Sequence, residues 1–304
     1  MDNLTHTLTG VAVARLGLDK RVAGATLTLA LACNLPDLDI VTGFAGSASY
    51  LEHHRGITHA FAASPVLAAG LAFVLSRWPK SPPRFVPTFL LAWLGIWIHI
   101  VEDLWTSYGT RALLPFDAGW YSWDWIFIVD PALLVLLIAA GYGARWFKKP
   151  SANRWAALGV VAYIALRATV HGIALENARA EAGREFSLVR AFPDPLSLNR
   201  WRFLASNETT FASGVLEALG TSVNKVTFAR AQPDALVERI AKESRMARVF
   251  LDFSAYPKLE VRKEGEVTSI VWRDLRFADR RADGFFCEVK VGPDGRIQSE
   301  RIVF

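Results

Sequence analysis

The chain has 304 residues, of which 52% are hydrophobic and 21% are charged, and its mean hydropathy is +0.23. This composition is too apolar for an ordinary soluble domain and too highly charged for a bundle made only of membrane spans, so we expect a protein with both kinds of region. The formal net charge is +5, but the basic residues of the first half lie in short clusters between apolar runs, which indicates membrane topology and argues against nucleic-acid binding.

The first part of the chain predicts an all-α membrane domain over residues 1–175. A hydrocarbon core of about 30 Å needs about 20 apolar residues in a helix. Five stretches approach this length, namely 22–41, 58–77, 86–106, 125–145 and 155–175. Residues 4–16 predict a shorter amphipathic or re-entrant helix. We therefore expect a multi-pass bundle of five to six helices that includes this short N-terminal one.

Three basic clusters alternate with the apolar runs and predict the orientation of the bundle. They are Arg15, Lys20 and Arg21; Arg77, Lys80 and Arg84; and Arg145, Lys148, Lys149 and Arg154. Because cytoplasmic loops carry an excess of Lys and Arg, we place all three clusters inside. The connections 42–57 and 107–124 then lie outside, together with the C-terminal half. The first residues lack the basic region of a signal peptide, so we expect no cleaved leader.

Residues 176–304 predict a small soluble α+β domain. It opens with a helix that continues from the last apolar run, and a second helix is expected over residues 233–246. Five segments with strand-like patterning follow, at 248–253, 258–263, 268–277, 284–291 and 296–304, with turns at 263–266 and 292–296. This half has no histidine and no catalytic constellation, so we expect an accessory domain.

Histidines and carboxylates gather at the predicted outer ends of the membrane helices, where ionisable groups are costly and usually serve a function. Pro36 cannot continue a regular helix, and the turn that it favours would direct Asp37 and Asp39 to one place. His99 and Asp103 are four residues apart, so they lie on one helix face. The full set, with the polar residues that accompany them, comprises His6, Asp37, Asp39, His53, His54, Arg55, His59, His99, Asp103, Tyr108, Arg111 and Asp130.

Taken one at a time, these residues have ordinary structural explanations. The two aspartates could cap a helix, His99 and Asp103 could share a hydrogen bond across one turn, and Asp130 could cap the helix that follows it. Independent structural roles give no reason for distant residues to share one depth. We therefore expect them to meet around a divalent cation. Histidine and carboxylate without thiolate are ligands for zinc, manganese or iron, and the isolated Cys33 and Cys287 predict neither a disulfide nor a thiolate site.

Five motifs in series carry a family resemblance. "NLTHTLTG", "NLPDLDI", "HHRGITHA", "HIVEDLWTSYGTRALLPF" and "WDWIFIVDP" occur in this order over residues 3–131. Together they resemble the bacterial membrane-bound metal-dependent hydrolase family. The resemblance implies a multi-pass inner-membrane protein with a metal-dependent hydrolytic centre, whereas the periplasmic location of the C-terminal domain is expected from the basic clusters alone. The His and Asp positions of the family correspond to His6, Asp37, Asp39, His54, His59, His99 and Asp103, and its motif arginine corresponds to Arg111.

The expected activity is metal-assisted hydrolysis of an ester, above all a phosphoester, in a lipid or lipid-linked substrate at the outer face. We predict one or two ions, zinc before manganese or iron, with ligands among His6, Asp37, Asp39, His59, His99 and Asp103. His54 is the predicted general acid or base, and Arg55 and Arg111 are predicted to hold phosphate oxygens. The expected partners are the bilayer and this substrate, and nucleic acid is not one of them.

Three alternatives remain open at this stage. The two arginines could anchor the protein to lipid headgroups. The polar cluster could line the path of a metal or proton transporter, which would place ionisable groups at several depths. The spans could also serve as a scaffold that holds a periplasmic binding domain.

Overall fold

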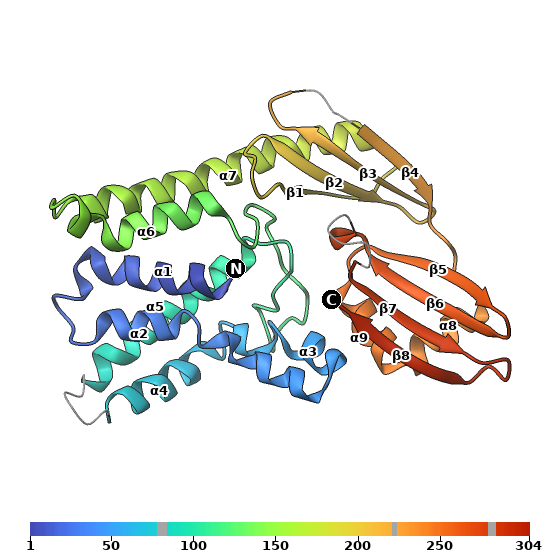
Figure 1. Cartoon of the computed structure of the whole chain (residues 1–304), viewed down its shortest axis with the longest axis horizontal. Helices are drawn as coiled ribbons and strands as arrows, with labels where there is room; N and C mark the ends of the chain where they lie inside the picture. Colours follow the sequence, from blue (N-terminus) through green and yellow to red (C-terminus); the bar gives the residue numbers. More distant parts are fainter. Residues whose placement is uncertain (78–83, 221–223, 279–283) are drawn as a thin grey trace. The chain divides into compact units, whose positions relative to one another are not determined.

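The computed structural model describes residues 1–77, 84–220, 224–278 and 284–304. Lys80, from the second basic cluster, lies outside the described residues. The chain folds into two compact units. The first unit contains residues 1–39, 55–174 and 192–201, and the second contains residues 40–54, 175–191 and 202–304. Helices dominate the first part of the chain and strands the last part (Figure 1).

The helical region confirms the predicted membrane character and gives fewer candidate spans than the five expected. Its helices are α1 (Asn3–Val13), a π-helix (Ala14–Leu18), α2 (Ala25–Ala32), a 3-10 helix η2 (Pro36–Ala45), α3 (Ser47–His53), a 3-10 helix η3 (Ile57–His59), α4 (Ser64–Leu75), α5 (Phe85–Leu104), α6 (Pro131–Trp146) and α7 (Ala152–Ala182). Within the described residues, α5 and α7 are long and apolar enough to cross a membrane, and up to 4 spans result if each of two bent pairs counts as one.

The missing spans are explained by helix breaks that hydropathy does not reveal. The predicted stretch 22–41 is divided between α2 and η2, because Pro36 begins a separate helix. The stretch 58–77 begins with the short helix η3 and continues as α4 after a turn. The stretch 125–145 yields α6, which has only 16 residues.

Small residues let the helices approach closely enough to assemble the site. A Cβ on Gly10 of α1 would lie 2.7 Å from the backbone oxygen of Leu29 in α2. A Cβ on Gly95 of α5 would lie 2.7 Å from the Cβ of Ala32, also in α2. Both glycines therefore permit close helix packing that no larger residue would allow without a shift. Figure 1 shows α2 running beside both α1 and α5.

The C-terminal domain contains two four-stranded antiparallel sheets and therefore more strands than the five predicted for the α+β module. The first sheet has the order β1-β2-β3-β4, and the second has the order β5-β6-β7-β8. Their strands are β1 (Leu188–Pro193), β2 (Arg200–Ser206), β3 (Thr210–Glu217), β4 (Asn224–Ala229), β5 (Pro257–Glu264), β6 (Val267–Asp274), β7 (Phe286–Val291) and β8 (Ile297–Val303), and a 3-10 turn (Leu275–Phe277) follows β6. The four strands of the second sheet match four predicted segments, whereas the first sheet was not predicted.

The predicted strand 248–253 is wrong, because these residues form a helix. Two helices, α8 (Ala235–Glu243) and α9 (Arg245–Phe253), occupy the region where one helix and one strand were expected. Ser244 separates them, and its hydroxyl accepts a hydrogen bond from the Ala247 N–H at 3.0 Å. The buried residues Ala247, Phe250 and Phe253 recur every third residue, which is the period of a helix face and not of a strand.

Residues 40–54 fold with the C-terminal domain in the second unit. Helix α3 packs against α9 and β8. The rings of Tyr50 and Phe304 meet edge to face with centroids 5.4 Å apart, and Arg245 pairs with Glu52 at 2.8 Å. The segment predicted as an outer connection between two spans is thus part of the same compact unit as the C-terminal strands.

Candidate metal centre

Four residues from three separate segments of the first unit converge on one point. Asp37 from η2, His59 from η3, and His99 and Asp103 from α5 each offer one ligand atom, and these atoms all lie within 4.8 Å of one another. His59, His99 and Asp103 are fully buried, while the Asp37 side chain is 14% exposed. Asp37 therefore marks the side from which solvent reaches the cluster.

His99 is held in one orientation by the backbone of α2. Its Nδ1 lies 2.7 Å from the carbonyl oxygen of Cys33. A carbonyl oxygen can only accept, so Nδ1 carries the hydrogen and Nε2 of the neutral ring keeps its lone pair. This Nε2 lies 3.0 Å from Nε2 of His59 and 3.5 Å from Oδ2 of Asp103. Gly95 lies one turn before His99, so the close approach of α5 to α2 makes the Cys33 contact possible.

His59 is oriented by a carboxylate and a hydroxyl on its other side. The Thr58 hydroxyl donates to Oδ2 of Asp39 at 2.8 Å, so its oxygen is free to accept from Nδ1 of His59 at 3.0 Å. Asp39 Oδ2 also lies 3.2 Å from the same Nδ1. Nδ1 is thus a donor, and Nε2 lies 3.3 Å from both Oδ1 of Asp37 and Oδ2 of Asp103.

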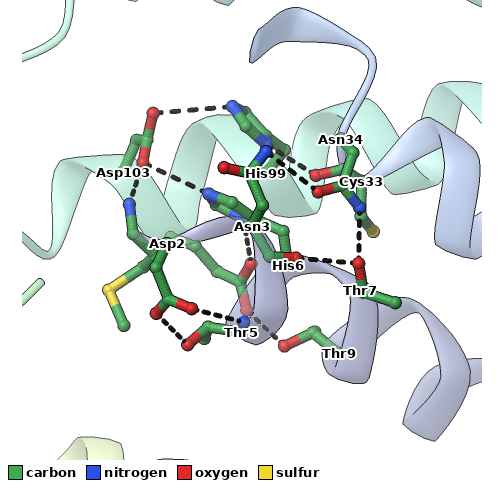
Figure 2. A network of polar contacts seen from close by, with 12 residues as sticks. Asp2, Asn3, Thr5, His6, Thr7, Thr9, Cys33, Asn34, His99 and Asp103 are labelled. Carbon is green, nitrogen blue, oxygen red and sulfur yellow. Dashed lines mark hydrogen bonds and ion pairs between the residues drawn. The ribbon is translucent and has the colours of Figure 1, made fainter. Parts of the chain in front are cut away.

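His6 repeats this arrangement from α1 (Figure 2). Its Nδ1 lies 2.7 Å from Oε2 of Glu102, and its Nε2 lies 3.5 Å from Oδ1 of Asp103. The ring stacks on His99 with centroids 3.9 Å apart. The Thr9 hydroxyl holds the other oxygen of Glu102 at 2.6 Å. All three histidines therefore have an oxygen partner at Nδ1 and direct Nε2 toward the carboxylates.

The convergence favours a cation at its centre. Lone pairs of imidazole nitrogens and carboxylate oxygens repel one another when nothing lies between them. One proton on Nε2 of His59 would satisfy a single acceptor, whereas His99, Asp37 and Asp103 all compete for it at 3.0 to 3.3 Å. Nε2 of His6 and Oδ2 of Asp103 are buried and form no hydrogen bond. A divalent cation satisfies the ligand atoms of Asp37, His59, His99 and Asp103 together, so this donor set fits a metal.

Arg55 is built into the cluster as the partner of Asp103. Its Nη2 lies 3.0 Å from Oδ1 of Asp103, and its Nη1 donates to the Thr106 hydroxyl at 3.0 Å. The backbone N–H of Arg55 donates to Oδ2 of Asp39 at 3.0 Å. Its backbone adopts the left-handed conformation with φ of 59°, and the residue is only 3% exposed. The Met1 amine also contacts Asp103.

The other two predicted catalytic residues, Arg111 and His54, have contacts of their own. The backbone N–H of Arg111 donates to the carbonyl of Arg55 at 2.9 Å, and the Arg111 guanidinium stacks 4.5 Å from the centre of the Trp120 ring. His54 lies in the second unit at the end of α3, where its ring stacks on Tyr50 with centroids 4.7 Å apart. The first unit thus brings together His6, Asp37, Asp39, His59, His99 and Asp103 with Arg55.

Glu102 is a member of the centre that was missed from the sequence. It is 1% exposed and orients His6. The signal was present in the motif "HIVED", because position 102 is three residues after His99 and therefore on the same helix face.

Asp130, by contrast, caps α6 by accepting from the Leu133 N–H at 2.9 Å. Burial raises the pKa of Cys287 to about 12, so this thiol stays protonated and inert.

Comparison with known proteins extends over the whole chain. The sequence profile of the YdjM inner membrane protein family matches residues 1–175, which include every residue of the metal centre. The uncharacterized protein YfhP of Bacillus subtilis (strain 168) is 26% identical over 318 residues, which cover 98% of this chain and 94% of that protein. No solved structure matches the chain. The similarity to YfhP therefore includes the C-terminal domain as well as the helices.

Proposed function

The chain belongs to the YdjM inner membrane protein family, and from this premise we propose that it is a membrane-bound metal-dependent hydrolase. The observation that carries the proposal is the convergence of Nε2 of His59 and of His99 on Asp37 and Asp103, with His6 beside them against Asp103. In metalloenzymes, ligating histidines donate their second N–H to a carboxylate or carbonyl. The three histidines of this centre have such oxygen partners. Nitrogen and oxygen ligands without thiolate favour zinc, with manganese and iron next.

The occupied atoms favour one ion over two. Oδ2 of Asp39 already faces Nδ1 of His59, the Thr58 hydroxyl and the Arg55 N–H. Both oxygens of Glu102 are likewise engaged. We therefore assign Asp39 and Glu102 to orienting the ligands, and His6, Asp37, His59, His99 and Asp103 to holding the ion. An ion there would lower the pKa of a bound water toward neutrality.

The chain's own residues supply the remaining electrostatics. Arg55 lies against Asp103 and offsets part of the negative charge that the carboxylates bring into the buried centre. Its Nε is buried and forms no hydrogen bond, which leaves a donor for an oxygen of the substrate. The backbone N–H of Arg111 donates to the carbonyl of Arg55, and we propose that the Arg111 guanidinium binds the same group of the substrate. His54 stays a prediction as the general acid or base.

The surface beside the centre favours a lipid or lipid-linked substrate. The carboxylates of η2 alternate with apolar side chains that face outward: Leu38 is 61% exposed and Ile40 62% exposed. Apolar side chains next to metal-binding carboxylates suit a molecule with a polar ester and an apolar tail. Within this class we propose a phosphoester, because guanidinium groups match phosphate geometry.

The outer face of the membrane is the proposed location of the centre. Residues 40–54 and the C-terminal strands fold together, so the connection after η2 and the C-terminal domain lie on the same side. The basic clusters at Arg15 and at Arg145 flank the opposite ends of the helices in sequence, and an excess of positive charge inside supports a periplasmic C-terminal domain.

A hydrolysis assay tests the proposal. The full chain is purified in detergent, stripped of metal with a chelator and reloaded with zinc, manganese or iron, and then incubated with labelled phospholipids and polyprenyl phosphates. We expect headgroup release that depends on metal and is lost in His99→Ala. The exposed neighbour His53 supplies the matched control, and His53→Ala should hydrolyse like the wild type. Metal binding without release from any substrate class would overturn the hydrolase proposal and favour a transporter or scaffold.

A further inference from the structure

A second polar pocket lies in the first unit and shares no residue with the metal centre. Its volume is about 300 Å³, at the lower end of the range for pockets that hold small ligands, which is about 300–1,000 Å³. It is formed between the N-terminus of α6, the middle of α7 and the loop 195–198, and its lining residues are Asp130, Pro131, Ala132, Tyr163, Arg167, Pro195, Leu196, Ser197 and Leu198.

Arg167 is a buried cation without a carboxylate partner among the described residues. It is 1% exposed. Its Nε donates to the carbonyl of Trp125 at 3.0 Å and its Nη1 to the carbonyl of Ser197 at 3.0 Å. The guanidinium stacks 4.9 Å from the centre of the Trp201 ring. Nη2 is buried and forms no hydrogen bond.

A bound anion would stabilise this buried guanidinium. Arginine is not deprotonated in proteins, so it carries its charge even when buried. A buried charge without an ion-pair partner is costly. Helix α7 is one of two helices in the described part of the chain that are long and apolar enough to cross a membrane, where that cost is larger. Neutral carbonyls satisfy two donors, and among the described residues the Asp130 carboxylate of the same pocket forms no ion pair with the guanidinium. An oxyanion in the pocket would supply the missing acceptor for Nη2.

Asp130 and Tyr163 limit the charge that this anion can carry. The Asp130 carboxylate accepts from the Leu133 N–H at 2.9 Å and from the Tyr163 hydroxyl at 2.8 Å. Because a carboxylate shares the pocket, a doubly charged anion is disfavoured by repulsion. A phosphate monoester carries a charge of about −1.5 to −2 at pH 7, whereas a phosphodiester has lost one of these ionisable oxygens and carries less.

The rim of the pocket indicates that the anion is attached to an apolar chain. Leu196 is 84% exposed and Leu198 is 42% exposed, and both lie in the loop that closes the pocket. Exposed leucines next to a helix of membrane length are suited to contact acyl chains and not water. We propose that the Arg167 pocket binds the phosphodiester of a membrane phospholipid, with the headgroup against Arg167 and the acyl chains along Leu196 and Leu198.

Native mass spectrometry of the full chain in detergent tests the proposal, with dihexanoyl phosphatidylethanolamine and inorganic phosphate as probes. Arg167→Met should weaken phospholipid binding about tenfold or more, the effect of losing a charge-assisted hydrogen bond. Leu196→Asp should weaken binding of the phospholipid and leave phosphate binding unchanged. Arg154 on the same helix is exposed, so Arg154→Met is the matched control and should bind like the wild type.

Two outcomes would overturn the inference. If Arg167→Met binds phospholipid as tightly as the wild type, the guanidinium is not the anchor. If inorganic phosphate binds as tightly as the phospholipid and Leu196→Asp changes neither, the pocket does not recognise a lipid. Should Arg167→Met fail to fold, Leu196→Asp still decides, because its side chain is largely exposed. Neither readout depends on hydrolysis, so the result is independent of the proposed function.

Discussion

Buried charge is handled in opposite ways in the second sheet and in the metal centre. Asp274 and Arg276, beside the second sheet, are 0% and 3% exposed. Nη2 of Arg276 lies 2.7 Å from Oδ2 of Asp274, and its Nε lies 3.2 Å from Oδ1. The same Nη2 donates to the carbonyl of Phe253 at 2.9 Å. The pair is closed, because each charge has its partner within the fold.

In the metal centre, equally buried groups face one another without enough hydrogens to join them. His6 and Asp103 each keep a buried polar atom that forms no hydrogen bond. The difference shows how buried polar groups that stabilise the fold can be told apart from those that bind a ligand. A set of groups that satisfies itself stabilises the fold, whereas a set whose free atoms point at one another is arranged for a ligand.

The largest expected effect on the free energy of unfolding comes from breaking the buried Asp274–Arg276 ion pair. Asp274→Ala leaves the Arg276 charge buried without its partner, so the free energy of unfolding should fall by about 3–5 kcal/mol. Chemical denaturation of the full chain in detergent, followed by the signal of the C-terminal strands, measures the loss. A decrease below about 1 kcal/mol would mean that the pair does not have the structural role assigned to it.

Metal should stabilise the metal centre, whose buried groups do not satisfy one another, and should not change the stability of the Asp274–Arg276 pair. Zinc at about 100 times its dissociation constant should raise the free energy of unfolding by about 2.7 kcal/mol in the wild type. His59→Ala should lose this increment, because its Nε2 lies at the centre of the cluster. Asp274→Ala should keep it. Thermal unfolding with zinc and with chelator provides the comparison, and a wild-type midpoint that does not respond would contradict the difference drawn between the two regions.

Glu102→Gln tests the role of the carboxylate that holds His6 without changing any proposed ligand of the ion. The amide can turn its oxygen toward Nδ1 but lacks the negative charge, so the affinity for zinc should fall about 10- to 100-fold. Competition with a coloured chelator measures the affinity. The exposed Glu208 provides the control, and Glu208→Gln should leave the affinity unchanged. Equal affinities for Glu102→Gln and the wild type would remove Glu102 from the centre.

The smallest effect is expected at the surface. Arg239 and Glu243 form an i, i+4 pair at 2.9 Å, and their side chains are 43% and 52% exposed. Glu243→Ala should lower the free energy of unfolding by only about 0.3–0.5 kcal/mol. Denaturation under the same conditions as for Asp274→Ala tests this, and a loss comparable to that of the buried pair would show that exposure is a poor guide to the energetics of this domain.

The site was more predictable from the sequence than the fold. His99 and Asp103 were placed on one helix face by their spacing alone, and His6, Asp37 and His59 were added by their expected depth in the membrane. Glu102 was overlooked although the same spacing rule includes it. His54 and His59 are only five residues apart, yet they belong to different units. The left-handed backbone at Arg55 lies between them, and spacing along the chain does not reveal such a turn.

The fold departs from prediction where long-range contacts decide local structure. In β2, four consecutive residues from Phe203 to Ser206 are buried, so the strand lacks the alternation by which a half-buried strand is recognised. In α9, the sequence "RVFLDF" alternates over a short window, but burial of Phe250 and Phe253 on one face selects a helix. The secondary structure of β2 and α9 is decided by the parts of the chain that each packs against.

Elemental analysis of the purified full chain tests the central claim most directly. The wild type and His53→Ala should each carry about one divalent ion per chain, and His59→Ala and Asp103→Ala should carry almost none. Equal metal content in all four proteins, or no metal in any of them after reloading, would contradict the account.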